Sequence, residues 1–527
     1  MKHLETLNER QRQVVSTTEG PVLILAGAGA GKTKTITHRI LHLIKNGVAP
    51  SSILAITFTN KAAKEMRERV EKLLSEDKTL NLPVSMRERP FVSTFHSLGV
   101  HILKENAQLI GLNRHFGIFD RNDSKRAVRD AIIESNLDPK QFEPGKILSI
   151  ISKQKGEMEN VLSFGEKTGR DFIKKVVHEV WQKYESTLLK EKSLDFDDLL
   201  LKTAQILKKY PEVLKYYQNI WKYIHVDEYQ DTNEVQYEIT KMLSEKNKNL
   251  CVVGDIDQNI YSWRGANIKN ILNFEKDYPE AKIVLLEENY RSTQTILSAA
   301  NDVIAKNKNR REKRLFTKNN EGEKIGLFVA SDETNEAKFI AKTSQELIKS
   351  GTDPKEIAVL YRANFQSRAL EEAFLTKNVP YQVLGTRFFD RKEIKDLLSF
   401  IKLSLNRESV NDLKRVINVP PRGIGKTTLL KIVMKKEDDL PSATKAKIEN
   451  FWNMISEIKN TIETEKTSHA IKKIIKIIKL DEYFKSEGEE GQERMENIKE
   501  LVTLASKYDG LPGTEGIEKL IEDATLA

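Results

Sequence analysis

The stretch Val22-Leu-Ile-Leu-Ala-Gly-Ala-Gly-Ala-Gly-Lys-Thr33 decides the fold of this chain. Its four apolar residues, Val22 to Leu25, predict a short buried strand, and a loop of alternating Ala and Gly comes next. Lys32 and Thr33 then begin an amphipathic helix. A strand, a small-residue loop and a helix in this order are typical of a phosphate-binding loop.

The loop residues predict how a nucleotide would be held. Backbone N–H groups can converge on phosphate oxygens at the positive end of the helix dipole. Lys32 would reach the β- and γ-phosphates, and the Thr33 hydroxyl would bind Mg²⁺. The strict pattern begins with Gly, whereas this chain has Ala26, and the alternative is a purely structural turn. The flanking strand and helix favour the nucleotide loop, whose predicted ATP-binding residues are Ala26, Gly27, Ala28, Gly29, Ala30, Gly31, Lys32 and Thr33.

Length and composition narrow the classes of protein. A chain of 527 residues should contain several domains. The net charge of +9 permits a polyanionic partner without requiring one. The single cysteine, Cys251, cannot form a disulfide within the chain, which fits a reducing compartment. No apolar run approaches the ~18 residues of a membrane span, so we expect a soluble, cytoplasmic protein without membrane contact.

Strands and helices alternate in the first hundred residues, which predicts a parallel α/β sheet. The apolar runs Ile53–Thr57 and Phe91–Phe95 read as further strands. Phe58 and Phe95 fall at strand ends, where an aromatic ring could stack on a nucleobase, although each could equally complete the core. Gln11, just before the first strand, is a candidate amide for reading adenine.

Paired acids come directly after the strand Tyr223–Val226. Asp227 can hold the Mg²⁺ shell, and Glu228 can position and deprotonate the attacking water. Acids at a strand end are common, but after a phosphate loop they indicate a metal–nucleotide site.

The strand Leu250–Gly254 leads into a loop that combines an amide, aromatic rings and a cation. Gln258 can sense the γ-phosphate. Tyr261, Trp263 and Arg264 offer the stacking surfaces and charge that single-stranded nucleic acid binds. The alternative is an aromatic corner that only stabilises the loop.

Seven motifs in order make the chain resemble superfamily 1 DNA helicases of the UvrD/PcrA/Rep type. They are Leu-Asn-x-x-Gln, Ala-Gly-Ala-Gly-Ala-Gly-Lys-Thr, Thr-Phe-Thr-Asn-Lys-Ala-Ala, Ser-Thr-Phe-His-Ser, Val-Asp-Glu-Tyr-Gln-Asp-Thr-Asn, Gly-Asp-x-Asp-Gln-x-Ile-Tyr-x-Trp-Arg-Gly-Ala and Glu-Asn-Tyr-Arg-Ser. This family often has Ala at the first loop position. The resemblance does not separate the three types.

The resemblance implies an α/β fold with two RecA-like parallel-sheet P-loop domains, each bearing a mainly helical insertion. The predicted domains are residues 1–114 with 193–286, their insertion 115–192, a second RecA-like domain 287–389, and its insertion 390–527. The implied activity is ATP-dependent movement from 3′ to 5′ on single-stranded DNA with strand separation, using ATP and Mg²⁺. The implied partners are single-stranded DNA, duplex junctions and repair or replication proteins.

The same resemblance assigns further site residues. Tyr290 would stack on adenine, Arg291 would act as an arginine finger, and Arg39 would contribute to ATP binding. With Gln11, Lys32, Glu228 and Gln258 these complete the predicted nucleotide site. The predicted DNA-binding residues are Phe58, Asn60, Thr94, His96, Phe196, Tyr261, Trp263, Arg264, Arg362, Asn364, Gly423 and Gly425.

The second half is less sharply patterned. Ile283–Leu286, Ile325–Val329, Ile357–Tyr361 and Tyr381–Leu384 read as strands, and the chain then turns helical to its end. Gly425-Lys-Thr427 comes after prolines rather than a strand, so we interpret it as a turn between helices near a DNA phosphate, not a second nucleotide site.

The family's pattern continues with a Gly-Leu-Glu-type segment and a second arginine-bearing segment. Neither occurs before Ala527, so we expect the second domain and its insertion to be incomplete. Two functions stay open on the sequence alone. One is an ATP-driven DNA motor. The other is a nucleotide-gated single-stranded DNA-binding module with little unwinding.

Overall fold

A computed structural model describes residues 2–77, 89–262, 265–307, 313–362, 366–383, 389, 391–434, 436, 440–485, 489–511 and 514–526. The chain divides into two compact units. Unit 1 comprises Met1–Asn319 with Lys392–Ala527, and unit 2 comprises Asn320–Arg391. The domain borders expected from the sequence stay predictions.

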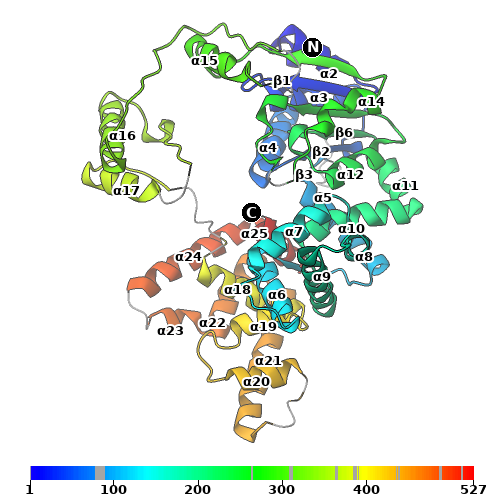
Figure 1. The fold of residues 1–527 in the computed structure, drawn as a ribbon, viewed down its shortest axis with the longest axis vertical. Helices are drawn as coiled ribbons and strands as arrows, with labels where there is room; N and C mark the ends of the chain where they lie inside the picture. Colours follow the sequence, from blue (N-terminus) through cyan, green and yellow to red (C-terminus); the bar gives the residue numbers. More distant parts are fainter. Residues whose placement is uncertain are drawn as a thin grey trace. The chain divides into compact units, whose positions relative to one another are not determined.

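Unit 1 contains a six-stranded sheet in the order β3-β2-β6-β7-β1-β8, in which every neighbouring pair is parallel (Figure 1). The strands are β1 (Val22–Ala26), β2 (Ile53–Thr57), β3 (Phe91–Thr94), β6 (Tyr223–Val226), β7 (Leu250–Gly254) and β8 (Lys282–Leu286). All six were predicted from their apolar runs, and β8 belongs to this first sheet. Parallel strands place their carboxyl ends at one edge, which is where such sheets bind ligands.

Helices cover both faces of this sheet. Alternate strand residues enter two different cores, Leu23 and Leu54 in one and Ile24 and Ala55 in the other. The helices are α2 (Glu9–Ser16), α3 (Lys32–Lys45) and α4 (Asn60–Glu76) on one face, and α5 (Phe95–Glu105), α10 (Phe196–Lys209), α11 (Pro211–Ile220) and α12 (Glu234–Ser244) on the other. The cysteine, Cys251, packs as a buried apolar residue.

The segment between β3 and β6 forms its own helical core, as predicted. Its helices are α6 (Arg121–Glu134), α7 (Pro144–Gly156), α8 (Val161–Glu166) and α9 (Phe172–Lys190). Two short strands frame these helices, because β4 (Gly117–Phe119) pairs in parallel with β5 (Ser193–Asp195). Three-residue strands are too short to show an alternating pattern.

Unit 2 is built on two helices, α16 (Glu333–Lys349) and α17 (Ser367–Thr376). The strands predicted at 325–329, 357–361 and 381–383 are wrong, since these residues pair with no neighbour among the described part of unit 2. Leu327 and Leu360 are largely exposed. An apolar run forms a strand only beside a partner that accepts its backbone hydrogen bonds. Leu384 lies outside the described residues.

The chain from Lys392 onward is helical, as predicted. Its helices are α18 (Lys392–Leu405), α19 (Val410–Val416), α20 (Lys426–Val433), α21 (Ser442–Thr464), α22 (Thr467–Ile478), α23 (Leu480–Lys485), α24 (Glu489–Ala505) and α25 (Glu515–Leu526). Unit 1 also contains α1 (Lys2–Glu5), α13 (Lys269–Leu272), α14 (Phe274–Asp277) and α15 (Gln294–Ile304). Among the described residues, every helix is too short or too polar to cross a membrane.

Candidate functional site

The phosphate loop joins β1 to α3 at the carboxyl edge of the sheet. Gly27 N donates to Leu286 O at 3.0 Å, and Ala30 N donates to Gly27 O at 3.2 Å. Gly31 has φ 79°, a left-handed conformation that favours glycine, and serves as the N-cap of α3. Lys32 is therefore the first residue of a fourteen-residue helix whose positive dipole end faces the loop.

The predicted catalytic pair is brought together across the sheet edge. Lys32 Nζ donates to Glu228 Oε2 at 2.7 Å, and Thr33 Oγ1 lies 3.5 Å from Asp227 Oδ2. These four residues come from two loops almost 200 residues apart in the sequence. The hydroxyl and carboxylate oxygens of Thr33 and Asp227 are hard ligands of the kind that Mg²⁺ takes beside a nucleotide.

Asp227 and Glu228, the two acids after β6, differ in burial and in backbone conformation. Burial, with the neighbouring charge of Glu228, raises the pKa of Asp227 to about 6. Glu228 is more open, and its backbone is left-handed at φ 51°. A non-glycine residue in that region is strained, and such strain gathers at functional sites. The backbone thus turns the Glu228 carboxylate toward the phosphate loop.

Gln230 links this acidic pair to the loop after β7. Its Nε2 donates to Glu228 Oε2 at 3.0 Å, and its Oε1 accepts from Asp255 N at 2.9 Å. Gln230 is buried, and the sequence motif contained it without assigning it a role. Gln258, the predicted phosphate sensor, donates from Nε2 to Asp255 Oδ2 at 2.5 Å. One buried amide therefore joins the carboxylate to the loop that carries Gln258.

The segment after β8 packs on the phosphate loop. Asn289 Nδ2 donates to Ala28 O at 2.6 Å, and Tyr290 N donates to Gly29 O at 3.0 Å. A Cβ built on Gly29 would lie 2.8 Å from the Cβ of Arg291, so the predicted arginine finger begins beside the loop. The contact of Asn289 was not predicted, because it joins positions more than 250 residues apart.

A second group gathers beside Tyr290. Asn8, the N-cap of α2, donates from Nδ2 to the Tyr290 hydroxyl at 2.7 Å. Gln11 is buried and donates from Nε2 to Ala30 O at 3.1 Å, so its amide supports the phosphate loop. The half-exposed ring of Tyr290 stays a predicted stacking surface for adenine.

The predicted role of Arg39 in ATP binding needs correction. Arg39 is 1% exposed, and its guanidinium donates to the carbonyls of Val14, Thr17 and Thr18 at the end of α2. A cation committed to buried carbonyls is a helix-packing contact. We leave it out of the nucleotide site.

Aromatic residues line the same edge of the sheet. The rings of Phe58, after β2, and Tyr261, after β7, are stacked with centroids 5.4 Å apart. The rings of His96 and Phe196 lie 5.5 Å apart. Burial lowers the pKa of His96 to about 4, so this histidine is neutral at pH 7 and can act as a donor but not as a cation.

The remaining predicted DNA residues are scattered. Asn60 begins α4, and the buried Thr94 caps α5 by accepting from Ser97 N at 3.2 Å. Arg362 is exposed in unit 2. Gly423 and Gly425 lie in a turn between α19 and α20, as predicted, so the second Gly-Lys-Thr comes after a helix. The predicted Trp263, Arg264 and Asn364 lie outside the described residues.

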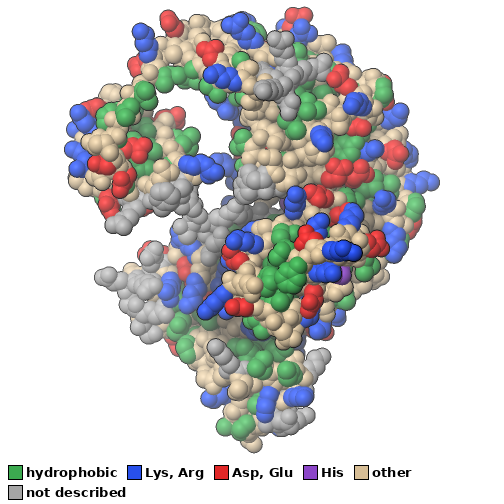
Figure 2. All heavy atoms as spheres, viewed as in Figure 1, with side chains coloured by type: hydrophobic (Ala, Val, Ile, Leu, Met, Phe, Trp, Pro, Cys, Tyr) green, Lys and Arg blue, Asp and Glu red, His purple; other side chains and the backbone are tan. Residues whose placement is uncertain are grey.

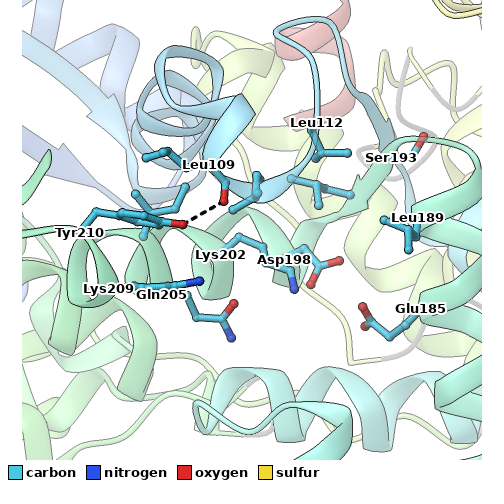
Figure 3. A pocket seen from close by; sticks show the side chains of 13 residues that line it. Leu109, Leu112, Glu185, Leu189, Ser193, Asp198, Lys202, Gln205, Lys209 and Tyr210 are labelled. Carbon is cyan, nitrogen blue, oxygen red and sulfur yellow. Dashed lines mark hydrogen bonds between the residues drawn. The ribbon is translucent and has the colours of Figure 1, made fainter.

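A separate cavity of about 380 Å³ lies between α9 and α10 (Figure 3). Asp198 and Lys202 lie side by side on its wall, and Tyr210 donates to Leu109 O at 3.2 Å. Behind Asp198, the buried Lys155 pairs with Asp195 and Asp198, both at 2.9 Å. The cavity shares no residue with the phosphate loop, and the ion pairs of Lys155 hold the start of α10, where Phe196 lies.

Charge on the surface is mixed. Figure 2 shows Lys and Arg side chains interspersed with Asp and Glu over the visible face. The aromatic edge, rather than a basic patch on this face, therefore marks the candidate DNA surface.

Comparison with known proteins agrees with this geometry. The family model for the UvrD/REP helicase N-terminal domain matches residues 7–279, and the UvrD-like helicase C-terminal domain matches residues 284–527. The ATP-dependent DNA helicase PcrA of Staphylococcus epidermidis is 47% identical over 431 residues, which is 81% of this chain and 58% of that protein. PcrA of Staphylococcus aureus is 46% identical over the same length. The chain spans about 58% of the length of these relatives.

Proposed function

The chain belongs to the UvrD/REP helicase family, and on that premise we propose that it is an ATP-driven motor that moves 3′ to 5′ along single-stranded DNA and separates duplex strands. ATP is the fuel, and single-stranded DNA and duplex junctions are the substrates.

The nucleotide chemistry is assigned to residues that already lie together. Lys32 and Arg291 would neutralise the charge that develops on the transferred phosphoryl group, and Glu228 would take the proton of the attacking water. Thr33 and Asp227 would hold Mg²⁺, which supplies positive charge to the phosphate oxygens when bound. Tyr290 would stack on adenine.

One observation carries the proposal: the hydrolytic and the aromatic residues share a loop. Residues 255–261 connect Gln258, which donates to Asp255, to Tyr261, which stacks on Phe58. Gln230 fastens that loop to Glu228. A change in the loop on DNA binding therefore reaches the carboxylate through a single buried side chain, which is how hydrolysis and DNA movement can be coupled.

The test measures ATP hydrolysis with and without single-stranded DNA, and strand displacement from duplexes with a 3′ or a 5′ tail. We expect DNA to stimulate hydrolysis and the 3′-tailed duplex to be preferred. The variant Lys32→Ala is the negative control for contaminating hydrolases. DNA that neither binds nor changes hydrolysis would overturn the proposal, and preference for a 5′ tail would overturn its polarity.

A further inference from the structure

Lys313, which no motif contains, lies buried against the loop that carries the predicted phosphate sensor. Its Nζ forms ion pairs with Asp255 Oδ1 and with Asp257 Oδ2, the latter at 3.2 Å. The three side chains are 7%, 3% and 8% exposed. Asp255 is also the acceptor for Gln258 Nε2. The Lys313 cation is thus one contact away from the Gln258 amide.

The backbone around Lys313 is held firmly. Phe316 N donates to Glu287 O at 3.1 Å, and Asn289 N donates to Phe316 O at 2.7 Å, so residues 313–316 return alongside the segment after β8. Asn301 of α15 exchanges two hydrogen bonds with Leu315, at 2.9 and 3.2 Å. The backbone from which the Lys313 side chain extends to the Gln258 loop is therefore held by hydrogen bonds.

Residues 313–316, which we call the strap, also contact the phosphate loop. A Cβ built on Gly27 would overlap Leu315 Cδ2, so glycine lets the strap approach this closely. The strap consequently contacts the first glycine of the phosphate loop through Leu315 and the Gln258 loop through Lys313. It is a physical connection between the two parts that must surround a γ-phosphate.

The positive charge of Lys313 matters in addition to its packing. Asp255 and Asp257 are two nearly buried carboxylates, and a nucleotide would add further negative charge close by. Without a cation between them, repulsion would push the Asp255–Gln258 loop away from the site. Lys313 offsets part of this negative charge and holds Asp255, the acceptor of the Gln258 amide, in place.

We propose that Lys313 is a positioning residue that fixes the Gln258 loop relative to the phosphate loop, so that the site distinguishes a nucleoside triphosphate from a diphosphate. The inference rests on the proposed function, because it concerns the same nucleotide site. Lys313 acts on the reaction through Gln258.

The experiment compares the parent chain with Lys313→Met, Lys313→Arg and Lys313→Met/Asp257→Asn, with the exposed Lys276→Met as a matched control. Binding of Mg-ADP and of a non-hydrolysable Mg-ATP analogue is titrated for each protein, and hydrolysis is measured in parallel. Lys313→Met should bind ADP as the parent does, lose its preference for the analogue, and turn over about 10- to 100-fold more slowly. Lys313→Arg and the double variant should recover part of that preference, and Lys276→Met should match the parent.

The outcomes separate this inference from the proposed function. A parent that binds no nucleotide overturns both. A parent that binds nucleotide, with unchanged analogue preference in Lys313→Met, overturns the role of Lys313 alone. Equal weakening of ADP and analogue with a lowered melting temperature also overturns it, since that is the effect of lost packing. If Lys313→Met does not fold, Lys313→Gln decides, because it removes the charge but keeps a polar side chain, and it should reduce analogue preference; parental preference there overturns the inference.

Discussion

Lys32 Nζ and Glu228 Oε2 are 2.7 Å apart, so the phosphate-loop cation and the predicted catalytic carboxylate form one ion pair. Phosphate oxygens that bind Lys32 compete with Glu228 for the same ammonium donors. Gln230 Nε2 also donates to Glu228 Oε2 at 3.0 Å. This second hydrogen bond can hold the Glu228 carboxylate in place when Lys32 binds a phosphate instead. Binding of the nucleotide would thereby release the base for its water.

We expect Glu228→Gln to keep nucleotide binding and to lose turnover. The amide cannot accept the proton of the attacking water, and a general base is worth about 10²–10⁴-fold in rate. The weaker pairing with Lys32 should leave affinity equal or higher. Nucleotide titration and steady-state hydrolysis measure the two effects, with the exposed Glu245→Gln as control. Loss of nucleotide binding would give Glu228 a structural role instead.

We expect Lys32→Ala to abolish hydrolysis in a folded protein. Lys32 contributes a charge at the start of α3, while the packing of that helix depends on Ile36 and Ile40, which are fully buried. Triphosphate affinity should fall, and the melting temperature should change little. Circular dichroism and hydrolysis assays test both points, with Lys64→Ala on the surface of α4 as control. Hydrolysis at the parental rate would refute the phosphate-loop assignment.

Much of unit 1 was predictable from sequence because its signals are local. The apolar runs before Lys32, Asp227 and Asp255 each mark a buried parallel strand, and a parallel sheet gathers the loops at the carboxyl ends of its strands along one edge. This arrangement of the strands alone predicts that Lys32 lies near Glu228. The motif resemblance then added Tyr290 and Arg291, which the structure places beside the same loop.

The unpredicted features depend on partners distant in sequence. Gln230, Asn289 and Lys313 are ordinary polar residues until the fold brings their acceptors close. Arg39, which the resemblance assigned to ATP binding, instead finds its acceptors at the end of α2, and those partners are not visible in a motif. The apolar run 325–329 failed as a strand for the converse reason, since the run alone cannot supply a pairing partner.

We expect Phe58→Ala to weaken single-stranded DNA binding by ~1–3 kcal/mol, with little dependence on base identity, because it removes a stacking face. Nucleotide binding without DNA should barely change. Fluorescence anisotropy with homopolymeric oligonucleotides measures the loss. Phe58→Leu separates stacking from packing against Tyr261, and Phe172→Ala, on an exposed position of α9, is the control. Unchanged DNA affinity with a lowered melting temperature would assign Phe58 to the core.

Glu191 lies where the insertion after β4 meets the helices that begin at Lys392. Its Oε2 accepts from Asn411 N at 3.2 Å, and burial raises its pKa from 4.5 to about 7. Between these two pH values the folded chain keeps a proton that the unfolded chain releases, so this residue's contribution to stability falls as pH rises through the window. Glu191→Gln keeps the acceptor without the charge. It should therefore raise the melting temperature at about pH 8 and have little effect near pH 4.5. Thermal unfolding across this range tests the sign, with the exposed Glu179→Gln of α9 as control. Destabilisation at the higher pH would show that the Glu191 carboxylate is ionised and stabilising in the folded chain, and an equal shift at both pH values would show that folding does not raise its pKa.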